Sequence, residues 1–207
     1  MWPQTDKTQE LLDGAKQGDA SAVNQLLDRH RRAVQRMVRM RLDQRIRARV
    51  DVSDVVQDVL VEANRRLRDY LDNPTMAFHL WLRQIAKDRI IDAHRRHRGS
   101  AKRSVDREQA AAPWGEQQSS IQLAAQLSDP QLTPAAAATQ QELARRVEQS
   151  LTDLGEQDCE IIVMRHYEQL SNQEAAAALG LTEAAASMRY LRAIRRLQSW
   201  LDEPPPR

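Results

Sequence analysis

The sequence has little that supports strands, disulfide bonds or a membrane span. Aromatic residues make up 4% of the 207 residues, 6 residues are glycine, and Cys159 is the one cysteine. One cysteine excludes an intramolecular disulfide and any zinc site that needs several cysteines. No apolar run approaches the roughly 20 residues of a membrane span, and the first residues lack the apolar core of a signal peptide. These absences predict a cytoplasmic protein.

Helix-forming residues dominate instead. Ala, Arg, Leu and Gln are abundant, and no alternating pattern of a β-strand is sustained, so the predicted fold is all-α. Two small helical domains are predicted, over residues 1–103 and 142–207. The stretch 104–141 between them is rich in Ala, Gln and Ser, contains prolines and lacks periodicity, which predicts a flexible linker. The role of Trp114 within that linker is left open.

The net charge of +2 conceals an uneven distribution. Residues 1–103 carry 22 Lys and Arg against 14 Asp and Glu, whereas 104–141 and 142–207 each have a net charge of −3. A basic first half favours contact with a polyanion such as a nucleic acid.

Three amphipathic helices are predicted in the first domain. The first spans residues 19–42, and the second begins after a cap at Asp51 or Ser53. The third runs from about residue 75 to about residue 97, with Gly99 as the residue that ends it. The second helix carries an apolar stripe and an opposite polar side. The stripe is formed by Val55, Val56, Val59, Leu60, Ala63 and Leu67, and the polar side by Asp54, Gln57, Asp58 and Glu62.

The turn between the second and third helices allows two interpretations. Asp72, Asn73, Pro74 and Thr75 are residues typical of turns. A polar loop over 70–75 that includes Tyr70, beside a basic helix, could hold an extruded base, or it could be a simple interhelical loop. The spacing alone does not separate the two. Phe78 and Trp81 lie three residues apart on the apolar side of the third helix, which favours a core position over stacking on bases.

Residues 170–200 predict a helix-turn-helix. Ser171 is a helix N-cap, and Glu174 completes a capping box. Gly180 can take the left-handed conformation that ends a short helix, and Thr182 can cap the next one. Such a pair places its second helix in a major groove of DNA. The alternative, an alanine-rich hairpin with a solvated charged side, leaves the coincidence of caps and basic residues unexplained. The basic residues of the second helix are Arg189, Arg192, Arg195 and Arg196.

Candidate catalytic and metal-binding groups are few. The sequence contains no phosphate-binding glycine loop and no metal signature. His94 and His97 are spaced to share a metal, but neighbouring arginines oppose a cation, so a helix end facing a polyanion is favoured. Asp88 and Asp92 are surrounded by basic residues, which favours surface ion pairs over acid–base catalysis. We therefore predict no enzymatic activity, no metal and no cofactor.

Three segments together resemble the extracytoplasmic function (ECF) group of bacterial RNA polymerase sigma factors. They are DVSDVVQDVLVEA over 51–63, FHLWLRQIAKDRIIDAHRR over 78–96 and LTDLGEQDCEIIVMRHYEQLSNQEAAAALGLT over 151–182, followed by RYLRAIRRL. The resemblance covers both predicted domains in the family's order. It implies a transcription initiation factor that binds core RNA polymerase, at the β′ clamp helices and the β flap, and recognises the −10 and −35 elements of promoter DNA. It also implies an anti-sigma factor as a partner.

The resemblance implies a role for each matching residue. Residues 1–103 would dock on polymerase, recognise the −10 element and aid strand opening, and residues 142–207 would bind the −35 element. The implied polymerase-docking residues are Asp54, Gln57, Asp58 and Glu62. The implied −10 residues are Asp72, Asn73 and Thr75 in the base-capturing loop, with Lys87, Arg89, Arg95 and Arg96 along the opened strand. The implied −35 residues are Thr182, Glu183, Ser187, Met188, Arg189 and Arg192.

Several positions depart from the family pattern. Asp88 stands where the family prefers Asn, Gly155 replaces a usual Pro, and Cys159 replaces a usual Arg. Residues 186–188 read Ala-Ser-Met where Val-Lys-Ser is typical, which removes a phosphate contact and leaves the −35 sequence open. The competing hypotheses are a free-standing helix-turn-helix regulator that binds a palindrome without polymerase, and a metal-dependent enzyme built on the two histidines.

Overall fold

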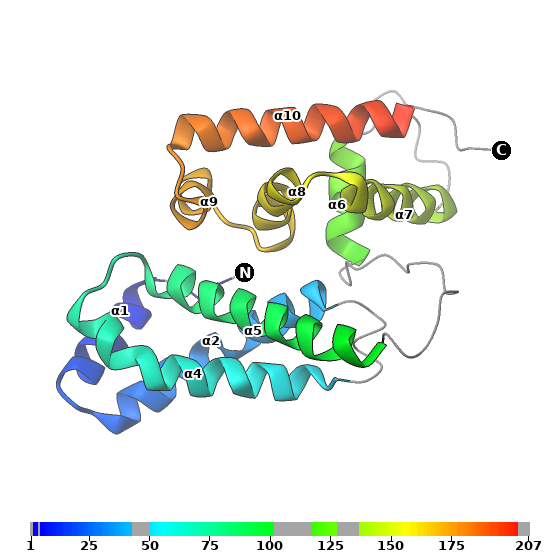
Figure 1. Cartoon of the computed structure of the whole chain (residues 1–207). Coiled ribbons are helices and arrows are strands. Elements are labelled where there is room, and N and C mark those ends of the chain that lie inside the picture. Colours follow the sequence, from blue (N-terminus) through cyan, green and yellow to red (C-terminus); the bar gives the residue numbers. More distant parts are fainter. Residues whose placement is uncertain (1, 4, 43–49, 102–116, 128–136, 203–207) are drawn as a thin grey trace. The chain divides into compact units, whose positions relative to one another are not determined.

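The computed structural model describes residues 2–3, 5–42, 50–101, 117–127 and 137–202, and the chain divides into two compact units, Met1–Gln109 and Ala110–Arg207. The regular elements in these described ranges are all helical, which confirms the all-α class (Figure 1). Trp114, whose role the sequence left open, lies outside the described residues.

The first unit is a bundle of helices around one apolar core. Its helices are α1 (Thr5–Lys16), α2 (Ala20–Arg41), α4 (Val52–Asp72) and α5 (Phe78–Ala101). Figure 1 shows α4 and α5 as a hairpin, and α2 packs against both. Predicted apolar stripes fill the interior. The fully buried members include Leu26, Val34, Val38, Val59, Ala63, Leu82 and Ala86.

Caps in the first unit follow the sequence. The side chain of Asp19 accepts a hydrogen bond from the Ser21 amide at 2.8 Å, so α2 begins where the periodicity predicts. Asp51 caps α4 and accepts from the Ser53 amide at 2.8 Å, which resolves the choice between Asp51 and Ser53. These side-chain acceptors satisfy amides that a helix leaves unpaired at its start.

The structure adds α1 and corrects two predictions in the first unit. The sequence analysis did not identify α1, because its apolar side is short; Leu11, Leu12 and Ala15 are its buried apolar residues. Gly99 does not end the third helix but lies inside α5. Tyr70 is not part of a loop: it lies in the last part of α4 and is 7% exposed.

The second unit contains α6 (Gln117–Leu127), α7 (Ala137–Asp153), α8 (Glu156–Ile162), the π-helical turn η1 (Val163–Tyr167), α9 (Asn172–Leu179) and α10 (Glu183–Asp202). Figure 1 shows α10 as a long helix, and α7, α8 and α9 pack against it. The break at Leu154–Gly155 is confirmed, since Gly155 is the N-cap of α8. The predicted supporting residues Ile161, Ile162, Met164 and Tyr167 are all buried.

Within the predicted linker, residues 117–127 and 137–141 are helical. Leu123 and Ala124 of α6 are buried, and α6 packs against α7. The hydroxyl of Ser120 donates to Glu148 Oε1 at 2.6 Å and contacts the Tyr167 hydroxyl at 3.0 Å. These partners are far away in sequence, so local composition does not reveal them. The remaining linker residues, 104–116 and 128–136, lie outside the described residues.

Replacing Gly180 by Ala should lower the free energy of unfolding of the second unit by about 1–2 kcal/mol. Gly180 has φ 65° and ψ 32°, and nothing lies within 4 Å of an added Cβ, so the cost is conformational. Gly155 is the matched control, because it is equally open but has φ −58°. Native-state hydrogen exchange of peptides from 156–202 measures both variants. An equal loss at the two glycines would contradict the prediction.

Candidate functional site

The predicted helix-turn-helix is confirmed in the second unit, where α9 and α10 are joined by residues 180–182. The Ser171 amide donates to Glu174 Oε2 at 2.7 Å, and the Glu174 amide donates to Ser171 Oγ at 3.2 Å, which completes the capping box. Gly180 is left-handed, and the Ala185 amide donates to Thr182 Oγ1 at 3.2 Å. Local hydrogen bonds therefore fix where both helices begin and where α9 ends.

Small residues and one long-range bond hold α9 against α10. Ala175 and Ala176 of α9 and Ala186 of α10 are buried, so the two backbones approach closely. The side-chain amide of Asn172 donates to the Glu183 carbonyl at 3.0 Å, which ties the start of α9 to the start of α10. The angle at which α10 is presented is therefore set inside the unit.

An aromatic contact anchors the middle of α10 to η1. His166 Nε2 and the Tyr190 hydroxyl form a hydrogen bond of 2.9 Å, and the guanidinium of Arg165 lies 5.5 Å from the Tyr190 ring centroid. Burial, together with the nearby charge of Arg165, lowers the pKa of His166 to about 4. The imidazole is therefore neutral near pH 7, and α10 is held by an uncharged hydrogen bond beside one cation–π contact.

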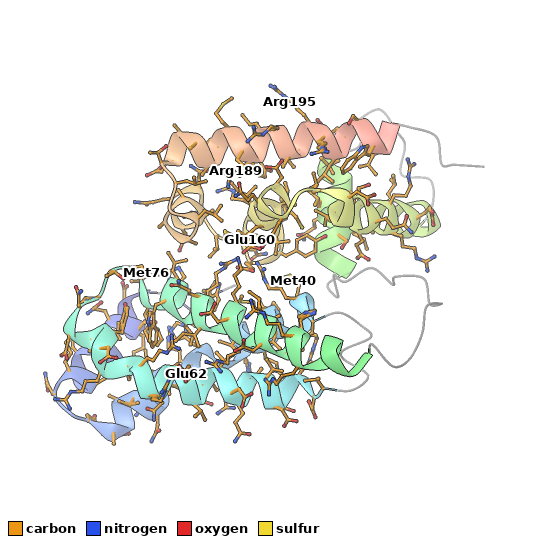
Figure 2. All side chains as sticks on the ribbon, viewed as in Figure 1. Met40, Glu62, Met76, Glu160, Arg189 and Arg195 are labelled. Carbon is orange, nitrogen blue, oxygen red and sulfur yellow. The ribbon has the colours of Figure 1, made fainter. Side chains whose placement is uncertain are left out.

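The six predicted −35 residues lie just before α10 or in its first half, with differing exposure. Thr182, Glu183, Met188 and Arg192 are exposed, whereas Ser187 and Arg189 are half-buried. Figure 2 shows Arg195 pointing away from the unit and Arg189 closer to the side of α10 that faces the other helices. Arg196 is exposed and lies over Trp200 at 5.2 Å from the ring centroid.

The predicted polymerase-docking residues lie on the side of α4 away from the core. Asp54, Gln57 and Asp58 are exposed, whereas the side chain of Glu62 is 12% exposed. The sequence analysis missed Val61, which lies among them and is 62% exposed. Its signal was available, because Val61 is an apolar residue outside the apolar stripe of this helix.

Glu62 is the centre of an ion-pair network between α4 and α5 (Figure 2 labels Glu62 on α4). Its carboxylate accepts from Arg65 at 2.7 Å, accepts from Arg66, and lies 3.6 Å from Arg89 of α5. Asp58 lies 3.6 Å from Arg96 of α5. The hydrogen bond from Arg65, helped by Arg66, lowers the pKa of Glu62 to about 2, so the carboxylate is ionised at neutral pH.

These pairs line a groove of about 410 Å³ between α4 and α5. The groove brings together two predicted sets that the sequence assigned to different partners, the docking carboxylates and part of the −10 basic residues. Lys87 does not join them, because it lies roughly half a turn around α5 from Arg89 and Arg96 at 3.6 residues per turn. The lining residues are Asp58, Val61, Glu62, Arg89, Asp92, Arg95 and Arg96.

The α4–α5 turn rests on buried aromatic rings. The Tyr70 hydroxyl donates to the Met76 carbonyl at 2.9 Å, and its ring lies 4.7 Å from that of Trp81. Phe78 is 3% exposed, so the predicted core position of this residue is confirmed. Asp72, Asn73 and Thr75 are exposed around the turn. The ring of Tyr70 is buried and therefore not available to stack on an extruded base. The side chains of Asp72, Asn73 and Thr75 remain accessible to one.

The candidate metal pair does not gather further ligands in the described part of the chain. His94 Nε2 lies 3.3 Å from the Arg41 carbonyl, and the side chain of His97 lies outside the described residues. Among the residues that the structure describes, no group of three or more His, Cys, Asp or Glu could hold a metal ion. Asp92 lies 3.6 Å from Arg89, as a surface ion pair. None of the described helices is long and apolar enough to cross a membrane.

Comparison with known proteins identifies the family. Residues 5–203 match the model described as ECF sigma factor. The chain is 31% identical over 203 residues to the RNA polymerase sigma factor CnrH of Cupriavidus metallidurans, covering 95% of both. It is 29% identical over 200 residues to the ECF RNA polymerase sigma factor SigD of Mycobacterium tuberculosis, covering 96% of this chain and 85% of SigD.

A solved structure agrees with this assignment. The structure of CnrH in complex with the cytosolic domain of CnrY matches with a TM-score of 0.59 at 28% identity, over 95% of this chain and 98% of CnrH. The family match spans both units, which favours it over the free-standing regulator and the metal-dependent enzyme. The chain therefore belongs to the ECF sigma factor family, and it is a transcription initiation factor that binds core RNA polymerase and directs it to promoters.

Proposed function

We propose that the first unit docks on core RNA polymerase through the exposed side of α4 and that both units contact promoter DNA. The proposal rests on two features that occur in the same chain. One unit has a helix with an acidic exposed side, and the other has a capped helix-turn-helix. One surface suits a basic protein partner and the other a nucleic acid. A free-standing regulator does not bind polymerase and so does not need the acidic side of α4.

The docking surface is formed by Asp54, Gln57 and Asp58, and exposed Val61 follows them one turn further along α4. An exposed valine beside polar side chains suits a protein interface, which combines apolar and polar contacts. The ion pair between Asp58 and Arg96 is long, and the two side chains are 53% and 61% exposed. Such a pair contributes little free energy, so Asp58 can leave Arg96 and bind a partner protein at little cost in stability. By the family resemblance this partner is the β′ clamp helices, and the second unit meets the β flap.

The −10 element is assigned to the α4–α5 turn and the basic side chains of α5. Asp72, Asn73 and Thr75 offer hydrogen-bonding groups to an extruded base, at a place made rigid by the bond between Tyr70 and Met76. Arg95 and Arg96 are exposed and supply backbone contacts. Lys87 lies on another side of α5, so it contacts a different part of the strand. This assignment explains the basic charge of the first half of the chain.

The −35 element is assigned to the outward side of α10. The helix is fixed by its bonds to α9 and η1, which favours a rigid reader placed in the major groove. Arg192 and Arg195 provide phosphate or guanine contacts, and the residues at the start of the helix meet base edges. The assigned −35 residues are Thr182, Glu183, Ser187, Met188, Arg189 and Arg192, of which Ser187 and Arg189 are half-buried and flank the outward side.

The chain acts by binding, without catalytic activity, metal or cofactor, and its place of action is the cytoplasm, where polymerase and promoters are. The relative CnrH was solved with the cytosolic domain of CnrY. We therefore propose that a regulatory protein of the anti-sigma kind binds this chain as well and holds it off polymerase.

In vitro transcription with the full chain and core RNA polymerase tests the proposal. Genomic fragments should give transcripts with a small set of discrete start sites that core polymerase alone does not produce. Replacing both Arg192 and Arg195 by Ala should lower promoter binding at least about tenfold, since each lost phosphate contact weakens binding and its salt dependence. The same variant should still co-elute with polymerase. Specific binding of the chain to a palindrome without polymerase would instead establish the free-standing regulator.

A further inference from the structure

The outward side of α10 changes in chemistry along its length. The buried side of this helix includes Ala186, Ala193 and Leu197. On the opposite side, at 3.6 residues per turn, the first half carries apolar groups and the second half carries cations. The apolar half consists of Ala184, Ala185, Met188 and Leu191; the cations of the second half are Arg192 and Arg195, and the neutral Ser199 follows them, all of these residues being exposed.

Met188 and Leu191 are unusual for a helix surface. They are 64% and 44% exposed, and among the described residues only Val61 and Ile91 are also large, apolar and exposed. Spaced by three residues, they form one continuous apolar patch next to two arginines. A patch of this kind, placed on an element that the unit holds rigidly, marks a contact surface.

We propose that Met188 and Leu191 are specificity-determining residues that read thymine methyl groups in the −35 element. The inference rests on the proposed function and names the base chemistry that the same helix recognises. In the major groove, thymine is the base that presents a methyl group, and apolar side chains contact it. The start of a recognition helix is the part that reaches base edges, and here that part is apolar.

The charges on the same helix identify DNA as the occupant. Arg192 and Arg195 border the patch, and Figure 2 shows Arg195 directed away from the unit. A polyanion seated on the helix places its phosphates at these guanidiniums while the apolar half meets the groove floor. An apolar helix of a protein partner would leave both arginines without carboxylates to meet. The flexible thioether of Met188 also adapts to a methyl group at more than one position.

Deoxyuridine substitution tests the proposal, because it removes the methyl group and leaves the base pairing intact. The −35 duplex is first selected from a randomised library by the full chain bound to core polymerase. Each thymine on either strand is then replaced by deoxyuridine. At one or more positions, the affinity should fall about three- to fivefold, as expected for one methyl group taken out of an apolar contact.

Side-chain variants assign the effect. In Met188→Ala/Leu191→Ala the penalty for deoxyuridine should vanish, whereas Ser199→Ala, on the same side of the helix, should keep it. All three positions are exposed, so the variants should remain folded. A selected element whose affinity does not depend on any thymine methyl, or a penalty that persists in the double variant, overturns the inference. Failure to select any duplex in the presence of polymerase overturns the proposed function instead.

Discussion

Replacing Asp54 and Asp58 by Lys should lower the affinity of the chain for core RNA polymerase on the order of 100-fold. Both carboxylates are exposed on the side of α4 that we assign to docking, on either side of Gln57 and next to exposed Val61. Reversing their charge removes attraction and sets like charges against a basic partner, which costs several kcal/mol across an interface. Co-elution or a fluorescence titration with core polymerase measures the affinity.

The control is Asp6→Lys/Asp13→Lys, which makes the same change in net charge on exposed positions of α1 in the same unit. It should bind polymerase within about threefold of the unchanged chain, because exposed charges remote from a contact are screened. Arg96→Ala provides a second control, since it removes the ion-pair partner of Asp58 without altering the docking side of α4. An equal loss of affinity for polymerase in the two charge-reversed variants would contradict the assignment of the docking surface to α4.

Acidification from pH 7 to pH 4 should reduce the free energy of unfolding of the first unit by roughly 3 kcal/mol through His30 alone. Burial, followed by the charges of His79 and Arg29, lowers the pKa of His30 from 6.5 to about 4. Between these values the unfolded chain binds a proton at this histidine and the folded chain does not. Stability is therefore complete above the unfolded pKa and falls as the pH drops towards 4.

The environment of His30 explains why it stays neutral. It is fully buried, 5.0 Å from the Phe78 ring in an edge contact, and it lies 6.2 Å from the Trp2 ring. Its Nε2 atom is 3.3 Å from the Thr8 hydroxyl, a neutral partner on α1. None of these neighbours is a carboxylate that could pair with a protonated imidazole. Protonation of His30 therefore lowers the stability of the packed helices α1, α2 and α5.

Urea unfolding at pH 7 and at pH 4.5, with hydrogen exchange of peptides from 5–101, isolates this effect from that of His166 in the second unit. His30→Gln and His30→Leu should both shrink the difference between the two pH values, whatever their effect at pH 7. An unaltered pH dependence in both His30 variants would show that His30 does not report the acid transition.

The groove between α4 and α5 matters for both assigned surfaces of the first unit. Glu62 contacts arginines of its own helix and Arg89 of α5, so the docking side and part of the DNA-binding side share charges. Spacing along the helix predicted the polar side of α4, and the family resemblance implied the basic set on α5. Neither could reveal that the two sets meet, because residues 62 and 89 come together only when α4 packs against α5.

The sequence by itself determined the features that depend on neighbours within four residues. The capping box of Ser171 and Glu174, the left-handed turn at Gly180 and the cap at Asp51 each form within one helical turn, so their residue types specify them. The same holds for the apolar stripes, which predicted the helices of the first unit from residue 19 onwards. This local information was enough to identify the fold class and the family.

Tertiary structure decided what depends on distant partners. It made α1 a helix by packing Leu11 and Leu12 into the core, and it docked α6 through Ser120, whose partners Glu148 and Tyr167 are 28 and 47 residues away. It also placed Tyr70, which the sequence analysis had put in the turn, inside α4 as a buried residue that supports the turn. Burial and charge pairing arise from packing between helices, and a stretch such as 117–127, without a strong stripe of its own, acquires its structure only from the surface that it covers.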